Sequence, residues 1–327
     1  MTIRLSFPII RLHFLTLSDE SCDRTKLHQK NNPKMQKSKD IFKSNNDLIG
    51  NQPIIYLMKI LIWGICLFSG IFLFFCHDLR LQIFGAFFAS IMMAHGIELQ
   101  HQALHENGFN NRLLNRVVGF FLGLPLLISY SHYKDRHIHH HQYVGTDQDS
   151  EFFQYSKEND NLGKFIYNLF MIPHWIRVSA YIFSAFTNQS FGEVYNKKNE
   201  NAIRNDYLIF GLFLLTSLLA IVLLNKIELS RIFLLFFCAA PIHTLIELPE
   251  HLGCEKDTDI FKNTRSIKSN WLMTWLTNGN NYHVEHHLIP SITPERLHIL
   301  HERINDQILF KNNSYTEFIA KLMTSQN

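Results

Sequence analysis

The residues best suited to chemistry in this sequence are histidines that recur at helical spacing. One segment has the pattern HxxHH, in which positions i, i+3 and i+4 lie on one face of a helix and aim three imidazoles at one point. A second HxxHH segment and an HxxxH pair stand upstream of it. Such clustering predicts a metal site, because without a metal the imidazoles would repel one another when protonated. The histidines of these three boxes are His101, His105, His137, His140, His141, His283, His286 and His287.

The number of histidines narrows the choice of metal. The presence of imidazole does not by itself identify the metal, because imidazole binds iron, zinc and copper. Structural zinc closes its shell with four ligands, whereas this many histidines supply two ions and leave coordination positions open. A pair of redox-active irons is therefore the leading assignment. The five cysteines show no C-x-x-C spacing and predict neither a zinc ribbon nor a disulfide framework.

The other histidines are expected not to bind metal. His95 lies six residues before His101 and faces the opposite side of its helix, and His139 points away from the face of its box. Five more histidines have no partner at ligand spacing: His132, His174, His243, His298 and His301.

Long apolar runs predict the elements that must position the boxes. Four of them offer enough residues, at ~1.5 Å each, to cross a hydrocarbon layer ~30 Å thick. The helix of the second run is expected to continue out of the bilayer and carry His101 and His105. Lys59, near the start of the first, is expected to snorkel to the membrane interface. The predicted fold is all-α, with spans at about 54–76, 81–99, 207–224 and 232–248.

Two further apolar stretches are not expected to cross the membrane. Residues 113–130 lie between the first two boxes, which must reach the same site, so this stretch should re-enter or lie on the membrane. Residues 162–187 are interrupted by Pro173 and Arg177 and predict an interfacial amphipathic helix.

The domain organisation follows from these runs. We expect a flexible polar tail over 1–52, with a membrane-surface segment at 5–17, and a C-terminal tail over 311–327. Residues 53–310 form the membrane domain, whose histidine-rich helical cap comprises 100–206 and 249–310.

The basic residues predict the orientation of this domain. The two hairpin turns contain only Arg80, Lys226 and Arg231, so the tail, the boxes and the C-terminus should share the cytosolic side. The net charge of +3 is too small to indicate a nucleic-acid partner.

The three boxes, distributed over a four-span hydrophobic protein, resemble the integral-membrane fatty acid desaturase family over approximately residues 50–310. The resemblance implies a non-haem centre of two iron ions that uses O2 and two electrons to remove two hydrogens from an acyl chain. It implies an acyl-chain lipid as substrate, on a glycerolipid, coenzyme A or another carrier. No His-Pro-Gly-Gly haem-binding segment occurs, so electrons are expected from a separate ferredoxin or cytochrome b5.

The resemblance also adds residues outside the boxes. It implies a ninth histidine ligand just past the last span, where His251 stands. Glu247 occupies a place where the family can use an asparagine that reaches the metal through water. Two roles are open for Glu247: it binds near the metal, or it is simply solvated. Asn281, in the polar segment before the third box, is a possible hydrogen-bond partner of a ligand. Carboxylates near the boxes are further candidates, with a solvated surface position as the safer reading: Glu98, Asp135, Asp147, Asp149, Glu151 and Glu285.

Two alternatives remain beside a desaturase. The same boxes serve hydroxylases and ketolases acting on a lipid or carotenoid. A histidine-lined metal transporter or sensor would place histidines inside the spans, but 54–76 and 207–224 contain none. The expected location is an inner bacterial membrane, or the endoplasmic reticulum in a eukaryote.

Overall fold

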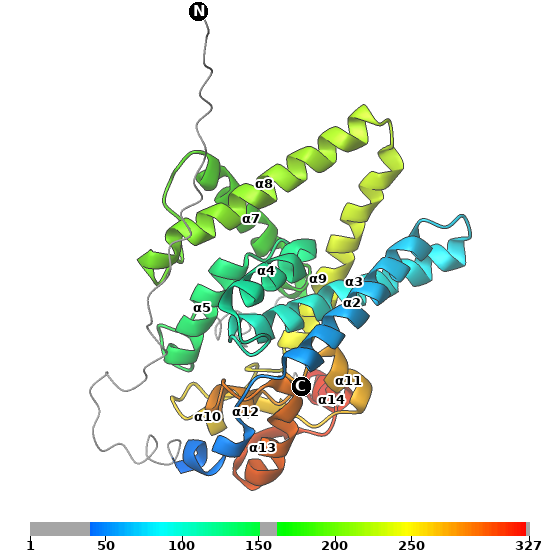
Figure 1. Ribbon diagram of the computed structural model, residues 1–327. Coiled ribbons are helices and arrows are strands. Elements are labelled where there is room, and N and C mark those ends of the chain that lie inside the picture. The colour runs from blue at the N-terminus through cyan, green and yellow to red at the C-terminus, as the bar shows by residue number, and fades with distance from the viewer. Residues whose placement is uncertain (1–39, 151–161, 325–327) are drawn as a thin grey trace, which may run out of the picture.

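The computed structural model describes residues 40–150 and 162–324, and within these ranges the chain is mostly helical (Figure 1). The all-α prediction is therefore confirmed. The membrane-surface segment expected at 5–17, most of the 1–52 tail and Glu151 lie outside the described residues.

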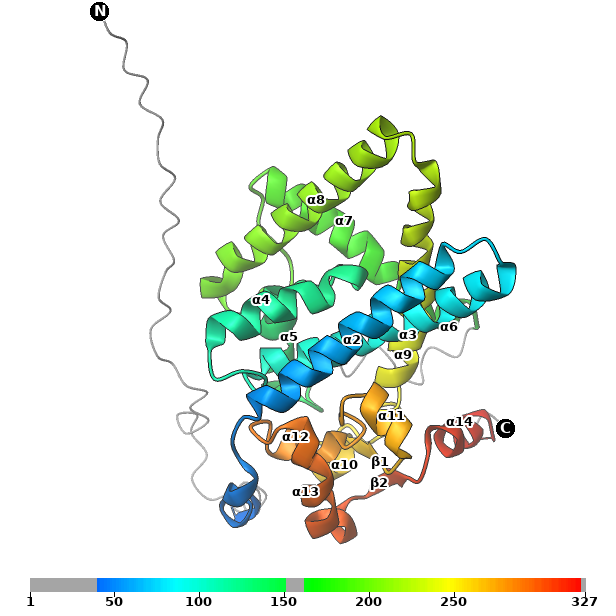
Figure 2. The same cartoon turned by 45° about the vertical axis from the view of Figure 1, so that its right-hand side comes forward.

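Four helical segments are long and apolar enough to cross a membrane, as the sequence predicted. They contain α2 (Pro53–Phe74), α3 (Leu79–Leu104), α8 (Glu200–Leu223) and α9 (Ile232–Glu247). As expected, α3 continues past its apolar part to the first box. The α2–α3 and α8–α9 turns both point away from the C-terminal helices (Figures 1 and 2). All the boxes can therefore lie at the opposite ends of these hairpins.

The α2–α3 hairpin is closed by a capped turn and by glycines. The Asp78 side chain accepts hydrogen bonds from the backbone N–H groups of Arg80 and Leu81, at 2.8 and 3.2 Å, and starts α3. A Cβ on Gly85 would lie 2.4 Å from the backbone nitrogen of Phe74, so only glycine permits this approach. The Trp63 indole further donates to the Met92 carbonyl at 2.7 Å. These contacts fix α3, which carries the first box.

The middle segment forms two bent helix pairs. Helix α4 (Arg112–Gly123) and a 3₁₀ turn (Leu124–Leu126) meet α5 (Tyr130–Tyr143) at 97°. Helix α6 (Leu162–Leu169) meets α7 (Ile172–Phe186) at 49°. The sharp bend after α4 returns the chain toward α3, so that α5 brings the second box beside the first.

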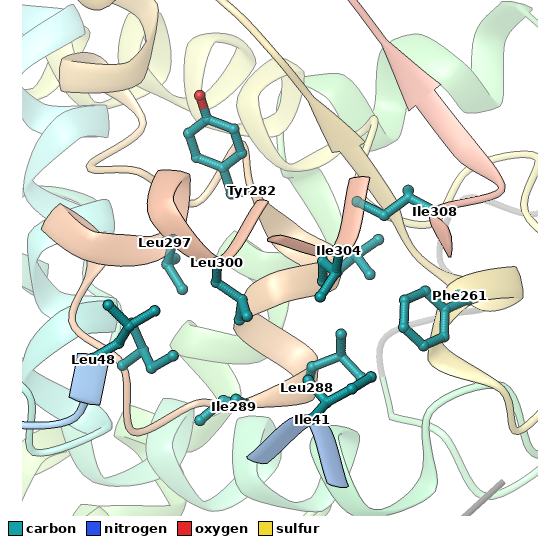
Figure 3. Close-up of a cluster of buried hydrophobic side chains, with 12 residues drawn as sticks. Ile41, Leu48, Phe261, Tyr282, Leu288, Ile289, Leu297, Leu300, Ile304 and Ile308 are labelled. Carbon is teal, nitrogen blue, oxygen red and sulfur yellow. The ribbon is translucent and has the colours of Figure 1, made fainter. Parts of the chain in front are cut away.

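The C-terminal region is built from short elements on a small apolar core. Its elements are α10 (Ile260–Asn263), β1 (Arg265–Ile267), α11 (Trp271–Leu276), α12 (His283–Leu288), α13 (Leu297–Ile304), β2 (Phe310–Asn312) and α14 (Tyr315–Thr324). The two strands pair in parallel, which the sequence did not predict. Figure 3 shows Leu288 of α12 in one buried cluster with Leu300, Ile304 and Ile41. This cluster seats the third box.

The prediction that Lys59 snorkels to the interface is wrong. Its ammonium donates to the Asn278 side-chain oxygen at 2.6 Å and pairs with the Glu295 carboxylate at 2.6 Å. Both acceptors belong to the segment around the third box, and only 17% of the Lys59 side chain is exposed. The lysine is therefore held by a buried partner and ties α2 to the C-terminal region.

Candidate metal centre

The structure gathers the predicted ligands into two adjoining groups of buried or half-buried imidazoles. In the first group, the Nε2 atom of His137 lies 2.8 Å from that of His101 and 2.9 Å from that of His141. The Nε2 atoms of His141 and His286 are 3.1 Å apart. Within this group all ligand atoms lie within 4.8 Å of one another, and its members are His101, His105, His137, His141 and His286.

The second group has four members and includes the ninth histidine. The Nε2 atom of His287 lies 3.3 Å from that of His140 and 3.1 Å from that of His283. His251 completes the group, with its ring centroid 5.2 Å from that of His287. All nine sequence-predicted histidines are thus placed together.

The donor atoms fit bound cations. An octahedral ion about 2.1 Å from each imidazole nitrogen sets adjacent ligands, at right angles, about 3.0 Å apart, which matches the observed separations. The Nε2 atom of His105 is buried and has no hydrogen-bond partner among the residues that the structure describes, as expected for a nitrogen that binds a metal. Burial, reinforced by neighbouring imidazoles, holds the pKa values of His105, His283 and His287 well below the usual range. These rings are therefore neutral, the form that binds metal.

The expectation that each HxxHH box aims at a single point is wrong. His137 and His141 join the first group while His140 joins the second, and in the third box His283 and His287 separate from His286. The reason is helical geometry, since positions i and i+4 differ by about 40° whereas i+3 and i+4 differ by about 100°. Each of the two HxxHH boxes therefore contributes to both groups, whereas His101 and His105 both belong to the first group.

Asp149 and the Asn263 carbonyl orient two imidazoles of the second group. The Nδ1 atom of His140 lies 2.7 Å from Asp149 Oδ1, and both side chains are almost fully buried. The Nδ1 atom of His251 lies 2.9 Å from the Asn263 carbonyl. Each acceptor holds a proton on Nδ1 and so leaves Nε2 of the same ring for a metal. Asn263 gave no sequence signal, because a backbone carbonyl carries none.

The expectation that the carboxylates near the boxes lie at the solvated surface is wrong for four of them. Besides Asp149, buried Glu285 accepts from the Ser266 hydroxyl and contacts His301, both at 2.5 Å. Asp135 accepts from backbone N–H groups of the segment before α8, and Glu98 accepts from Asn280 at 2.6 Å. Burial without such partners would be costly, so these groups hold the scaffold together.

Two candidates lie away from the histidine groups. The Asp147 side chain is 88% exposed and pairs with Lys256, so the expectation of a solvated surface position is confirmed for this residue. Asn281 donates to the Ile267 carbonyl at 2.7 Å and accepts from the Thr277 hydroxyl at 3.0 Å. It therefore connects β1 to the third-box segment and does not contact a ligand.

Glu247 joins a group that sequence reasoning missed. Its carboxylate lies 3.4 Å from Nε2 of His243, while Nδ1 of that ring lies 3.9 Å from Glu98. His243 was expected to have no partner, although its i, i+4 spacing to Glu247 is a signal that could have been used. The other histidines that were expected not to bind metal lie outside both groups. His139, for example, stacks on Tyr195 with ring centroids 3.7 Å apart.

A cavity of about 180 Å³ adjoins both histidine groups. One part of its wall contains His101, His137, His251 and His283. The rest comes largely from α5 and α7 and includes Arg136, Arg177 and Val178. A substrate bound there would face the histidines directly.

Comparison with known proteins supports this arrangement. Residues 79–319 match the family model described as fatty acid desaturase, which spans both histidine groups. The chain is also 28% identical to dihydrorhizobitoxine desaturase of Bradyrhizobium elkanii over 214 residues. That alignment covers 61% of each protein, so the chain spans less than two thirds of this relative's length.

Proposed function

The chain belongs to the fatty acid desaturase family, and from this premise we propose that it is a membrane-bound, O2-dependent di-iron desaturase that introduces a C=C bond into an acyl chain. The observation that carries the proposal is the division of nine buried or half-buried histidines into groups of five and four. Two irons bound there would supply the oxidising power that an unactivated C–H bond requires.

The protein's own residues prepare the site for this reaction. The first group would hold one ion through α3, α5 and α12, and the second would hold the other, with Asp149 fixing the ring of His140. The adjoining cavity would bind the substrate against the histidines and limit access of water. The reaction consumes O2, two electrons and two protons, removes two hydrogens from the substrate and releases two waters.

The proposal includes partners and a location. Electrons come from a separate ferredoxin or cytochrome b5, which docks on the side of the membrane that carries the boxes. That side is cytosolic by the distribution of lysine and arginine.

The test is expression in a host of known lipid composition, followed by fatty acid profiling. Purified protein should contain about two irons per chain, and His140→Ala or His286→Ala should each remove one group's ion and abolish the product. His139→Ala is the matched control, because His139 lies beside His140 but outside both groups. All variants should remain in the membrane.

Three results would contradict the proposal. They are full turnover by either ligand variant, an iron-free active protein, and a product that gains oxygen in place of losing two hydrogens. The last result, detected by mass spectrometry, would identify a hydroxylase or ketolase.

A further inference from the structure

The cavity beside the histidines has a strongly polar side that a hydrocarbon does not need. Helix α7 lines it with residues one turn apart, His174, Arg177 and Tyr181. Helix α5 faces them with His132 and Arg136, on the same helix that carries the second box. An acyl chain offers only methylenes, so a wall of this kind indicates a charged or polar part of the substrate.

Arg177 is the second arginine of this wall, and it differs from Arg136 in its partners among the described residues. Arg136 already pairs with Glu193 at 3.4 Å. Over residues 40–150 and 162–324, no carboxylate lies within ion-pair distance of Arg177. It is partly buried in the cavity wall, and a half-desolvated guanidinium without an anion is unfavourable unless a ligand supplies one.

The neighbours of Arg177 complete a polar recess. The Tyr207 hydroxyl lies 2.9 Å from Nδ1 of His132, and the Tyr181 ring packs against His132 with centroids 5.0 Å apart. These contacts fix the side chains around Arg177. The other carboxylates of the wall already have imidazole neighbours, since Glu98 and Glu247 lie beside His243 and Glu250 lies 3.3 Å from Nε2 of His283. Arg177 is therefore the group of this wall best placed to meet a substrate anion.

The size of the cavity limits how far this anion is from the reacting carbon. An engineered cavity of about 150 Å³ encloses one benzene molecule, and the space here is about 180 Å³. That space holds a group of only a few carbons between Arg177 and the histidines. A longer chain would have to extend out of the cavity.

We propose that Arg177 binds an anionic group, a carboxylate or a phosphate, which the substrate carries within a few bonds of the carbon presented to the histidines. This inference rests on the proposed function and gives its substrate class. It favours an acidic substrate over a neutral carotenoid, and it makes Arg177 a specificity-determining residue.

Direct binding tests the inference without turnover. Iron-loaded full-length protein in a neutral detergent is titrated with hexanoate, with hexanamide and with inorganic phosphate, and binding is followed by calorimetry. Hexanoate should bind at least about tenfold more tightly than hexanamide, because it keeps a charge-assisted hydrogen bond. Arg177→Gln should remove this preference, Arg177→Lys should keep part of it, and Arg80→Gln, at the exposed start of α3, should leave it intact.

The outcomes separate the sources of the anion and the two proposals. Preference for phosphate over hexanoate would assign a phosphate-bearing substrate. Equal binding of hexanoate and hexanamide to the wild type, or an unchanged preference in Arg177→Gln, would overturn the inference. So would an Arg177 effect seen only as stabilisation by phosphatidylglycerol vesicles over phosphatidylcholine vesicles, because the partner would then be a lipid headgroup. Loss of iron or of product with the hexanoate preference intact would instead count against the proposed function alone.

Discussion

The contact between Asp149 and His140 allows a quantitative test of the second histidine group. The two atoms are 2.7 Å apart and both side chains are buried, so the bond is a charge-assisted hydrogen bond in a medium of low dielectric constant. Such a bond contributes about 1.5–3 kcal/mol, which corresponds to roughly a 10- to 150-fold change in an equilibrium constant. Asp149→Asn keeps the shape and removes the charge. We expect the iron affinity of the second group to decrease by a factor within that range.

The assay is a chelator challenge followed by iron analysis. Wild-type protein and Asp149→Asn are incubated with increasing chelator, and the iron remaining per chain is measured. The variant should lose one iron at about 10- to 150-fold lower chelator concentration and retain the other, because the metal ligand that Asp149 contacts, His140, belongs to the second group. Asp147→Asn, two residues away and 88% exposed, should behave like the wild type.

One result would refute the reasoning. If Asp149→Asn retains both irons as tightly as the wild type, the carboxylate does not set the orientation of the His140 ring. Asp149 also accepts a hydrogen bond from the Gly145 backbone at 3.1 Å, so circular dichroism must first show that the variant is folded.

The remaining predictions concern the scaffold. Lys59→Met should leave the Glu295 carboxylate without its ion-pair partner and lower the stability by about 3 kcal/mol. The double variant that also carries Glu295→Met should lose less, and melting temperatures in detergent check both. Equal melting temperatures for wild type and Lys59→Met would argue against a stabilising role of the Lys59–Glu295 ion pair. Burial raises the pKa of the Cys254 thiol to about 11, from 9.0, so folded protein should have about 100-fold less thiolate there at pH 8 than an ordinary cysteine. Iodoacetamide labelling of Cys254 should therefore be slow below pH 9 and accelerate as the pH approaches 11. Rapid labelling at pH 7 would contradict it.

Sequence reasoning predicted the helices and the eight box histidines because both depend on local patterns. Apolar length identifies a span without reference to the rest of the chain, and histidine spacing identifies a helix face. The assignment of His251 as a ligand needed the family resemblance, because none of the box histidines is near His251 in the sequence.

Long-range partners could not be predicted in the same way. Lys59 meets Asn278, which is 219 residues away, and no local pattern records that contact. Asp149 was expected at a solvated surface position, yet the turn after α5 folds it back onto His140, nine residues earlier. His243 and Glu98 belong to different spans that only tertiary packing brings together.

Both HxxHH helices supply histidines to both groups, so the two groups depend on the same turns of backbone. In α5 and in α12, the same short turn of backbone feeds both groups, with the fourth residue of each box, His140 or His286, reaching across to the other group. A one-residue insertion within either turn would rotate its later histidines by about 100° and dismantle both positions at once. Such an insertion would therefore disable both groups together, whereas the replacement of a single ligand histidine would affect only the group to which that histidine belongs.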